Sequence, residues 1–157
     1  MMPLVSAVVL LLASTPALAA MPEPGRLDDE KTALWTAIDD VRRSIALFEA
    51  TLAHGKWRPF PRILRAKRRR VRRLVKLAIA RGHGDPPVLW DRAGVAAPPE
   101  RTAACARAVD QELRNAAIYE TALAQRLSPR VERKLRAIHR VVRNRHIVAF
   151  EACVRAG

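Results

Sequence analysis

The sequence predicts an all-α protein, an antiparallel bundle of four helices with one long loop between the second and third. Apolar residues recur at alternating steps of four and three, the spacing of a helix that buries one face. No stretch shows the alternation of β-branched and polar residues that is typical of a strand. Proline and glycine gather in a few short segments, which indicate the connections between helices.

The first helix is expected from Leu27 to His54, because acidic residues favour a helix N-terminus and Gly55 can end it. The second follows the segment 57–61 and runs to about Arg81, where a cluster of glycine and proline begins. The long loop comes next and ends at a pair of prolines.

The third helix is expected from Glu100 to Leu127, and the fourth from Ser128 to about Cys153. Serine is a favoured N-cap, and Pro129 fits the first helical position because its missing N–H has no partner there in any case. The connection between these two helices is so short that they must be antiparallel neighbours.

The N-terminal segment has the outline of a secretory signal peptide that covers residues 1–19. Met1–Leu12 carries no charged side chain, and Ala17 and Ala19 are the small residues that a signal peptidase requires. The apolar run is too short to cross a bilayer, and no other stretch in the mature chain is a transmembrane candidate. Residues 20–157 are then expected to form one four-helix domain that is periplasmic or secreted.

The two cysteines, Cys105 and Cys153, are expected to form a disulfide. Counted outward from Ser128, they lie at nearly the same height in the hairpin of the third and fourth helices. Export would deliver them to an oxidising compartment where such a bond persists. The alternative is a pair of free buried thiols.

The chain has 29 Lys or Arg residues against 15 Asp or Glu, a formal net charge of +14. Twelve of these basic residues lie between Thr51 and Gly84, a segment without an acid. Those outside the buried face of the second helix form a candidate patch for an anionic envelope component or another polyanion. Its members are Arg65, Arg68, Arg69, Arg72, Arg73 and Lys76. An ordinary solvated face is the alternative, and sequence-specific nucleic-acid reading is not expected, since no stacking or helix-turn-helix motif is present.

Ionisable residues also fall on the buried faces, near the middle of each helix. They are Asp40 beside the first stripe, Lys67 and Arg70 on the second, Glu112 on the third, and His139 and His146 on the fourth. A carboxylate on an apolar stripe is costly unless it is paired, so Glu112 is expected to have a cation or a metal as partner. Alternatively, the long side chains of Lys67 and Arg70 could extend outward and place their charged groups in solvent.

Three further motifs accompany these residues. They are Arg58-Pro59-Phe60 before the second helix, Asn115-x-x-x-Tyr119 in the third, and Asn144-x-His146 with Ala149-Phe150-x-x-Cys153 in the fourth. Over about residues 30–153 the set resembles a secreted bacterial ferritin-like family of unknown function. The resemblance implies a bundle related to those that hold two iron ions between a carboxylate on the first helix, a Glu on the third, and Glu-x-x-His on the second and fourth.

Only part of that ligand set is present. The positions that match are Asp40, Glu112 and His146. Cations stand at the others, where the resemblance implies that they point inward in place of the metal: Lys67, Arg70 and Arg143. We therefore expect no cofactor, and interior pairs in which Lys67 and Arg70 neutralise the two acids.

Three functional hypotheses stay open. The first is a ferritin-like protein that has lost its di-iron site and has a binding or structural role. The second is a protein that holds one ion of iron, zinc or copper with Asp40, Glu112 and His146, with His139 as a further candidate ligand. The third is a polyanion- or envelope-binding module that acts through the second helix. An enzyme is not expected, since no phosphate loop, zinc-protease motif or recognisable nucleophile is present.

Overall fold

The computed structural model describes residues 24–157, with side chains from Asp28 onward. The expected signal peptide, residues 1–19, lies outside the described residues. Between residues 24 and 157 the chain forms helices and loops without a strand, which confirms the all-α class and the four helices. No helix in this part of the chain combines the length and the apolar character needed to cross a membrane.

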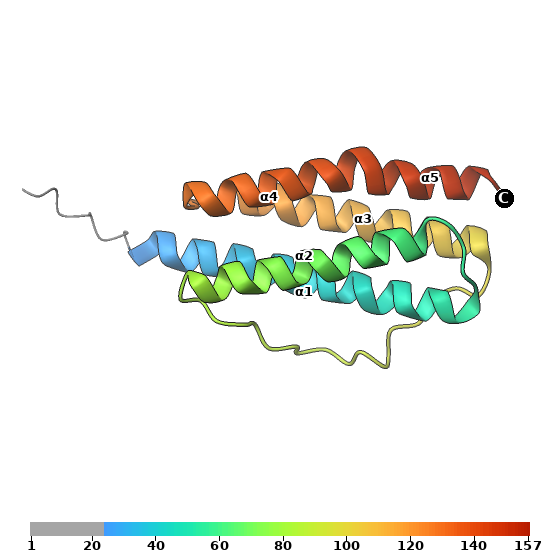
Figure 1. The fold of residues 1–157 in the computed structure, drawn as a ribbon, viewed down its shortest axis with the longest axis horizontal. Helices are drawn as coiled ribbons and strands as arrows, with labels where there is room; N and C mark the ends of the chain where they lie inside the picture. The colour runs from blue at the N-terminus through green and yellow to red at the C-terminus, as the bar shows by residue number, and fades with distance from the viewer. Residues whose placement is uncertain (1–23) are drawn as a thin grey trace, which may run out of the picture.

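The fourth helix is continuous but is built from three segments. The elements are α1 (Pro24–His54), α2 (Phe60–Ala80), α3 (Arg101–Leu123), α4 (Pro129–Val141), η1 (Val142–Ile147) and α5 (Val148–Arg155). They lie side by side, with α1 packed on both α2 and α3, and α3 packed along α4, η1 and α5 (Figure 1). Because α2 and α4 do not pack closely on each other, the bundle is more open on that side.

The third helix ends at Leu123, earlier than the predicted Leu127. The reason is that the chain must reverse direction before Ser128 begins the next helix. Leu127 is buried inside this turn, so its apolar character reflects the core rather than a helical stripe.

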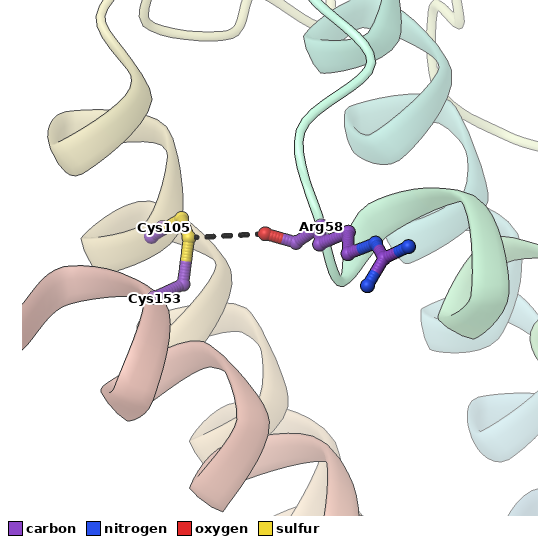
Figure 2. The surroundings of a disulfide bond; sticks show 3 residues. All are labelled: Arg58, Cys105 and Cys153. Atoms are coloured by element: carbon purple, nitrogen blue, oxygen red, sulfur yellow. Dashed lines mark hydrogen bonds between the residues drawn. A yellow bond between two sulfur atoms is a disulfide. The ribbon is translucent and has the colours of Figure 1, made fainter. Parts of the chain in front are cut away.

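One end of the core is aromatic and carries the disulfide. Phe48, Phe60 and Phe150 come from three helices, with ring centroids 4.9 to 5.4 Å apart. Such pairs add about 0.5–1.5 kcal/mol each beyond the burial of their area. The predicted bond between Cys105 and Cys153 is confirmed, with Cα atoms 5.9 Å apart (Figure 2).

The disulfide also touches the connection between α1 and α2. The Sγ atom of Cys153 lies 3.3 Å from the carbonyl oxygen of Arg58, which precedes α2 (Figure 2). A disulfide sulfur has no proton to donate, so this is a packing contact. It places the start of α2 against the hairpin of the last two helices.

The opposite end is held by Glu30, a fully buried carboxylate that the sequence indicated only as one of the acids at the start of the first helix. Its Oε1 lies 2.6 Å from Nε of Arg81 and 3.2 Å from Nε2 of His83, and its Oε2 accepts a 2.8 Å hydrogen bond from the backbone N–H of Ser128. Burial raises the pKa of Glu30, but the contacts with Ser128, Arg81 and His83 outweigh burial and hold the pKa at about 2. One side chain thus joins α1, the end of α2 and the turn before α4.

The long loop, residues 81–100, runs along α1 from one end of the bundle to the other (Figure 1). Nε1 of Trp90 donates a 2.7 Å hydrogen bond to Asp39, and Arg42 donates a 2.6 Å bond to the carbonyl oxygen of Pro86. Arg92 forms a 2.5 Å ion pair with Glu49. The loop is therefore fastened to α1, away from the side where α2 faces α4.

The fourth helix carries one residue more than a regular α-helix needs. Its buried positions are Val131, Leu135, Ile138, Val142, His146, Ile147, Phe150 and Cys153. The alternation of four and three fails after Val142, where the π-helical turn η1 absorbs the additional residue through its wider bonding pattern.

This turn corrects one expectation about the interior. Arg143 was expected inside, on the same face as His146, but it is exposed, as are Asn144 and Arg145. Because the turn is wider, His146 lies on the same buried face as Val142. The three residues between them are exposed to solvent. His139 was also expected on the buried face, but it is only partly buried, and the neighbouring Ile138 is buried instead.

Candidate functional site

Polar side chains from all four helices meet in the middle of the bundle, and we name them the interior cluster. None is more than 9% exposed. The members are Asp40, Lys67, Arg70, Gln111, Glu112, Asn115, Tyr119 and His146.

The centre of the cluster is an ion pair between α2 and α3. Nζ of Lys67 lies 2.6 Å from Oε1 of Glu112, and both side chains are fully buried. The ammonium also lies 5.6 Å from the ring centroid of Phe48, a distance at which the ring face attracts a cation. Burial lowers the pKa of Lys67, and the charge of Glu112 opposes that effect. For Glu112, burial raises the pKa, but Lys67 and His146 outweigh it and hold the pKa at about 2.

His146 supports the same carboxylate from the fourth helix. Its Nδ1 lies 3.0 Å from Oε2 of Glu112. Burial lowers the pKa of His146 below its ordinary value of 6.5, against the opposing influence of Glu112. The ring is therefore neutral at pH 7, and we assign its proton to Nδ1, because only a protonated nitrogen can donate to the carboxylate.

Asp40 is held by amides rather than by a cation. Nε2 of Gln111 donates a 3.0 Å hydrogen bond to its Oδ1, and Nδ2 of Asn115 donates to its Oδ2. Burial raises the pKa of Asp40, and the charge of Lys67 offsets this only in part. The two amides were not chosen from the sequence as partners, although Gln111 and Asn115 stand four residues apart on the face of α3 that also carries Glu112.

Arg70 lies inside the bundle but has no carboxylate partner. Its side chain makes no ion pair with any described residue, and its Nη1 is buried without a hydrogen-bond partner among them. Its charge acts on the hydroxyl of Tyr119, whose pKa burial raises well above the ordinary value. The expected pairing of two cations with two acids is thus replaced by one ion pair, one amide-bound acid and one unpaired guanidinium.

The three residues proposed as metal ligands are all buried, yet each carboxylate is engaged by nitrogen donors. Glu112 contacts Lys67 and His146, and Asp40 contacts two amides. No group of three or more His, Cys, Asp or Glu side chains in the described part of the chain is arranged to hold a metal ion. His139 is partly exposed and lies 2.9 Å from Glu120 on the surface, so the structure does not bring it to the others.

The basic residues predicted to face outward on α2 are all exposed. Arg68 is paired at 2.8 Å with Glu49 on α1. Others face α4, and together with its basic residues they border a hollow that we name the cationic groove. Besides Arg70 of the interior cluster, its charged members are Arg69, Arg73, Lys76, Arg130, Arg133 and Lys134.

None of these six side chains makes an ion pair with an acid in the described residues. The groove consists of two adjoining cavities of about 490 and 270 Å³ that share Arg73, Lys134 and Ala137. The contribution of α4 was not foreseen. Arg130, Arg133 and Lys134 have the spacing of one helical face, but nothing local in the sequence says that this face lies opposite α2.

Comparisons with models of protein families, with curated proteins and with solved structures found no match for this chain. The interior cluster and the cationic groove are therefore interpreted from their own geometry.

Proposed function

We propose that the protein is an exported, metal-free bundle of the ferritin-like type that binds polyanions through the cationic groove. The observation that carries this proposal is the convergence of six unpaired cations from two helices on one hollow that no acid lines. Binding of a polyanion there neutralises charges that otherwise repel one another and releases counterions.

The lack of acids around the groove contrasts with other surfaces of the same chain. Arg43 pairs with Asp39, Arg136 with Glu132, and Glu49 serves two arginines at once. Exposed arginines elsewhere, such as Arg107 and Arg155, also make no ion pair with a described acid. The groove is distinguished by the gathering of its cations around one hollow, and this gathering favours a binding role over a solvated face.

The interior cluster supports the metal-free part of the proposal. A di-metal centre needs carboxylates that are free to coordinate, and Lys67 already brings a positive charge to within 2.6 Å of Glu112. A metal would have to displace this ammonium and then share the site with it. The proposed resemblance of this bundle to ferritin-like bundles rests on the motifs in the sequence and on the long connection between α2 and α3.

Retention on a heparin column tests the polyanion function. The triple variant Arg69→Glu, Arg73→Glu and Lys76→Glu reverses three cations of the groove and is expected to elute at much lower salt than the parent. A matched variant with Arg107→Glu, Arg114→Glu and Arg155→Glu changes the net charge equally at exposed positions outside the groove. It should elute close to the parent. If both variants lost heparin retention equally, retention would depend on net charge alone, and the proposal would fail.

Elemental analysis of the natively purified protein tests the metal-free interior. We expect no stoichiometric iron, zinc or copper, and a melting temperature that a chelator leaves unchanged. A bound ion that disappears in His146→Ala, together with a chelator-sensitive melting temperature, would instead establish the single-metal alternative at Asp40, Glu112 and His146.

A further inference from the structure

The cationic groove is lined by charged side chains, which we call its rim, and by apolar side chains, which we call its floor. The floor is formed by short or aliphatic side chains from both helices: Ala66, Leu77, Ala80, Ala137, Ile138 and Val141. The alanines leave space that larger side chains would fill. No aromatic and no acidic residue lines either cavity in the described part of the chain.

A hollow of this kind suits one class of ligand better than a bare polyanion. Small-molecule sites are mostly apolar, measure about 300–1,000 Å³ and carry a few polar groups that orient the ligand. The larger cavity, at about 490 Å³, lies in that range, and the smaller one, at about 270 Å³, extends it along the helices. A ligand that fits both the rim and the floor has an anionic head and a hydrocarbon part.

We propose that the groove binds a phosphorylated amphiphile, with its phosphate on the cationic rim and its alkyl chain along the floor. This inference rests on the polyanion-binding function proposed above and names its ligand class. Guanidinium groups such as those of Arg69 and Arg73 match phosphate oxygens in a bidentate geometry. Each methylene that the chain places on the floor removes apolar surface from water and tightens binding.

Arg70 provides an independent observation at the same place. Its side chain lines the smaller cavity and is 9% exposed. Its Nη1 is a buried donor without a hydrogen-bond partner among the described residues. A buried donor left unused is costly, and a negative charge bound in the smaller cavity beside this side chain would lower that cost through its electrostatic attraction.

Two other polyanionic partners fit the groove less well. Single-stranded nucleic acid binds to sites that combine cations with aromatic stacking platforms, and the groove has no aromatic side chain among the described residues. Insertion into a bilayer requires an exposed apolar helix face, but Ile63 and Leu74 of α2 are already buried in the core. The geometry therefore favours a single amphiphile molecule that enters the groove.

Titration calorimetry on the purified full chain tests the inference. The probes are dodecyl phosphate below its micelle concentration, inorganic phosphate, and a short single-stranded oligonucleotide. We expect dodecyl phosphate to bind about tenfold or more tightly than inorganic phosphate. Ala137→Trp fills the floor without a change in charge and should abolish this advantage. Ala103→Trp, at an exposed alanine of α3 outside the groove, should preserve it.

The outcomes separate this inference from the function on which it rests. Equal affinity for the two phosphates, or an advantage that persists in Ala137→Trp, overturns the amphiphile. If heparin retention is then still lost on reversal of Arg69, Arg73 and Lys76, polyanion binding stands and only the ligand class fails. If the oligonucleotide binds more tightly than dodecyl phosphate, and Ala137→Trp leaves its affinity unchanged, the groove is a nucleic-acid site. That result also refutes binding of an amphiphile. Absence of heparin retention together with absence of amphiphile binding refutes both.

Discussion

Lys67 and Glu112 are fully buried, so neither charge is solvated by water. The attraction between two such charges roughly offsets their loss of hydration, and the pair need not add net stability. Removal of one partner has a different effect, because the remaining charge stays buried without compensation. In the intact protein His146 does not share the role of Lys67, since burial lowers the pKa of the ring below its ordinary value.

Glu112→Ala is therefore expected to lower the free energy of unfolding by about 3–5 kcal/mol, measured by urea denaturation. The double variant Lys67→Met and Glu112→Leu removes both charges and should lose much less. Glu120→Ala, at an exposed position of the same helix, is the control. A double variant that is less stable than Glu112→Ala would contradict an unpaired charge as the cause.

Acid should destabilise the protein through the same carboxylate and through Glu30. The pKa of each is lowered from 4.5 to about 2 in the folded state. A carboxyl group of this kind contributes stability above its unfolded pKa, and that contribution is lost as pH falls toward the folded pKa. We expect the melting temperature to fall between pH 4.5 and pH 2. The fall should be shallower in Glu30→Gln and in Glu112→Gln, and unchanged in Glu120→Gln.

At the scale of the helix, the repeat of four and three predicted the buried faces of α1, α2 and α3 well. It failed in the fourth helix, because one more residue separates Val142 from Phe150 than a regular repeat allows. A periodic pattern has no means to signal such an insertion, since each flanking segment is regular by itself. The misplacement of Arg143 follows from this single residue.

Deletion of Asn144 tests whether η1 is an inserted residue. With one exposed residue removed, the buried positions of the fourth helix regain a regular repeat, so the shortened chain should fold with a similar melting temperature and an intact disulfide. Deletion of Leu113, an exposed residue of the regular helix α3, should rotate Asn115, Ala116 and Tyr119 away from the core and prevent cooperative unfolding. Circular dichroism measured during heating distinguishes the two. Similar behaviour of both deletions would argue against this view of η1.

At the scale of the molecule, the local sequence predicted only some of the pairs of helices that pack together. The short turn before Pro129 made α3 and the fourth helix neighbours, and the positions of Cys105 and Cys153 followed from it. The opposition of α2 and α4 depends on the path of the long loop over α1, which no local pattern specifies. For that reason the basic residues of α2 were predicted, whereas their partners on α4 and the role of Glu30 were not.

The disulfide should contribute substantially to the stability of this assembly. Replacement of Cys105 and Cys153 by Ser removes a crosslink that spans 48 residues. In the chain-entropy model this costs about 4 kcal/mol of unfolding free energy, measurable by denaturant titration. A mass change on alkylation only after reduction verifies that the bond is present in the native protein. Parent and variant of equal stability would show that the crosslink constrains the unfolded chain little.

The contacts of Glu30 and the disulfide, at the two ends of the bundle, also affect which parts of the bundle can open locally. Glu30 joins helices at one end, and the bond between Cys105 and Cys153 joins them at the other. We therefore expect local opening to occur mainly where α2 faces α4, and we expect the backbone amides of α3, which is packed on both sides, to exchange slowest with solvent. The open side between α2 and α4 is then also the side from which the proposed ligand would reach the cationic groove.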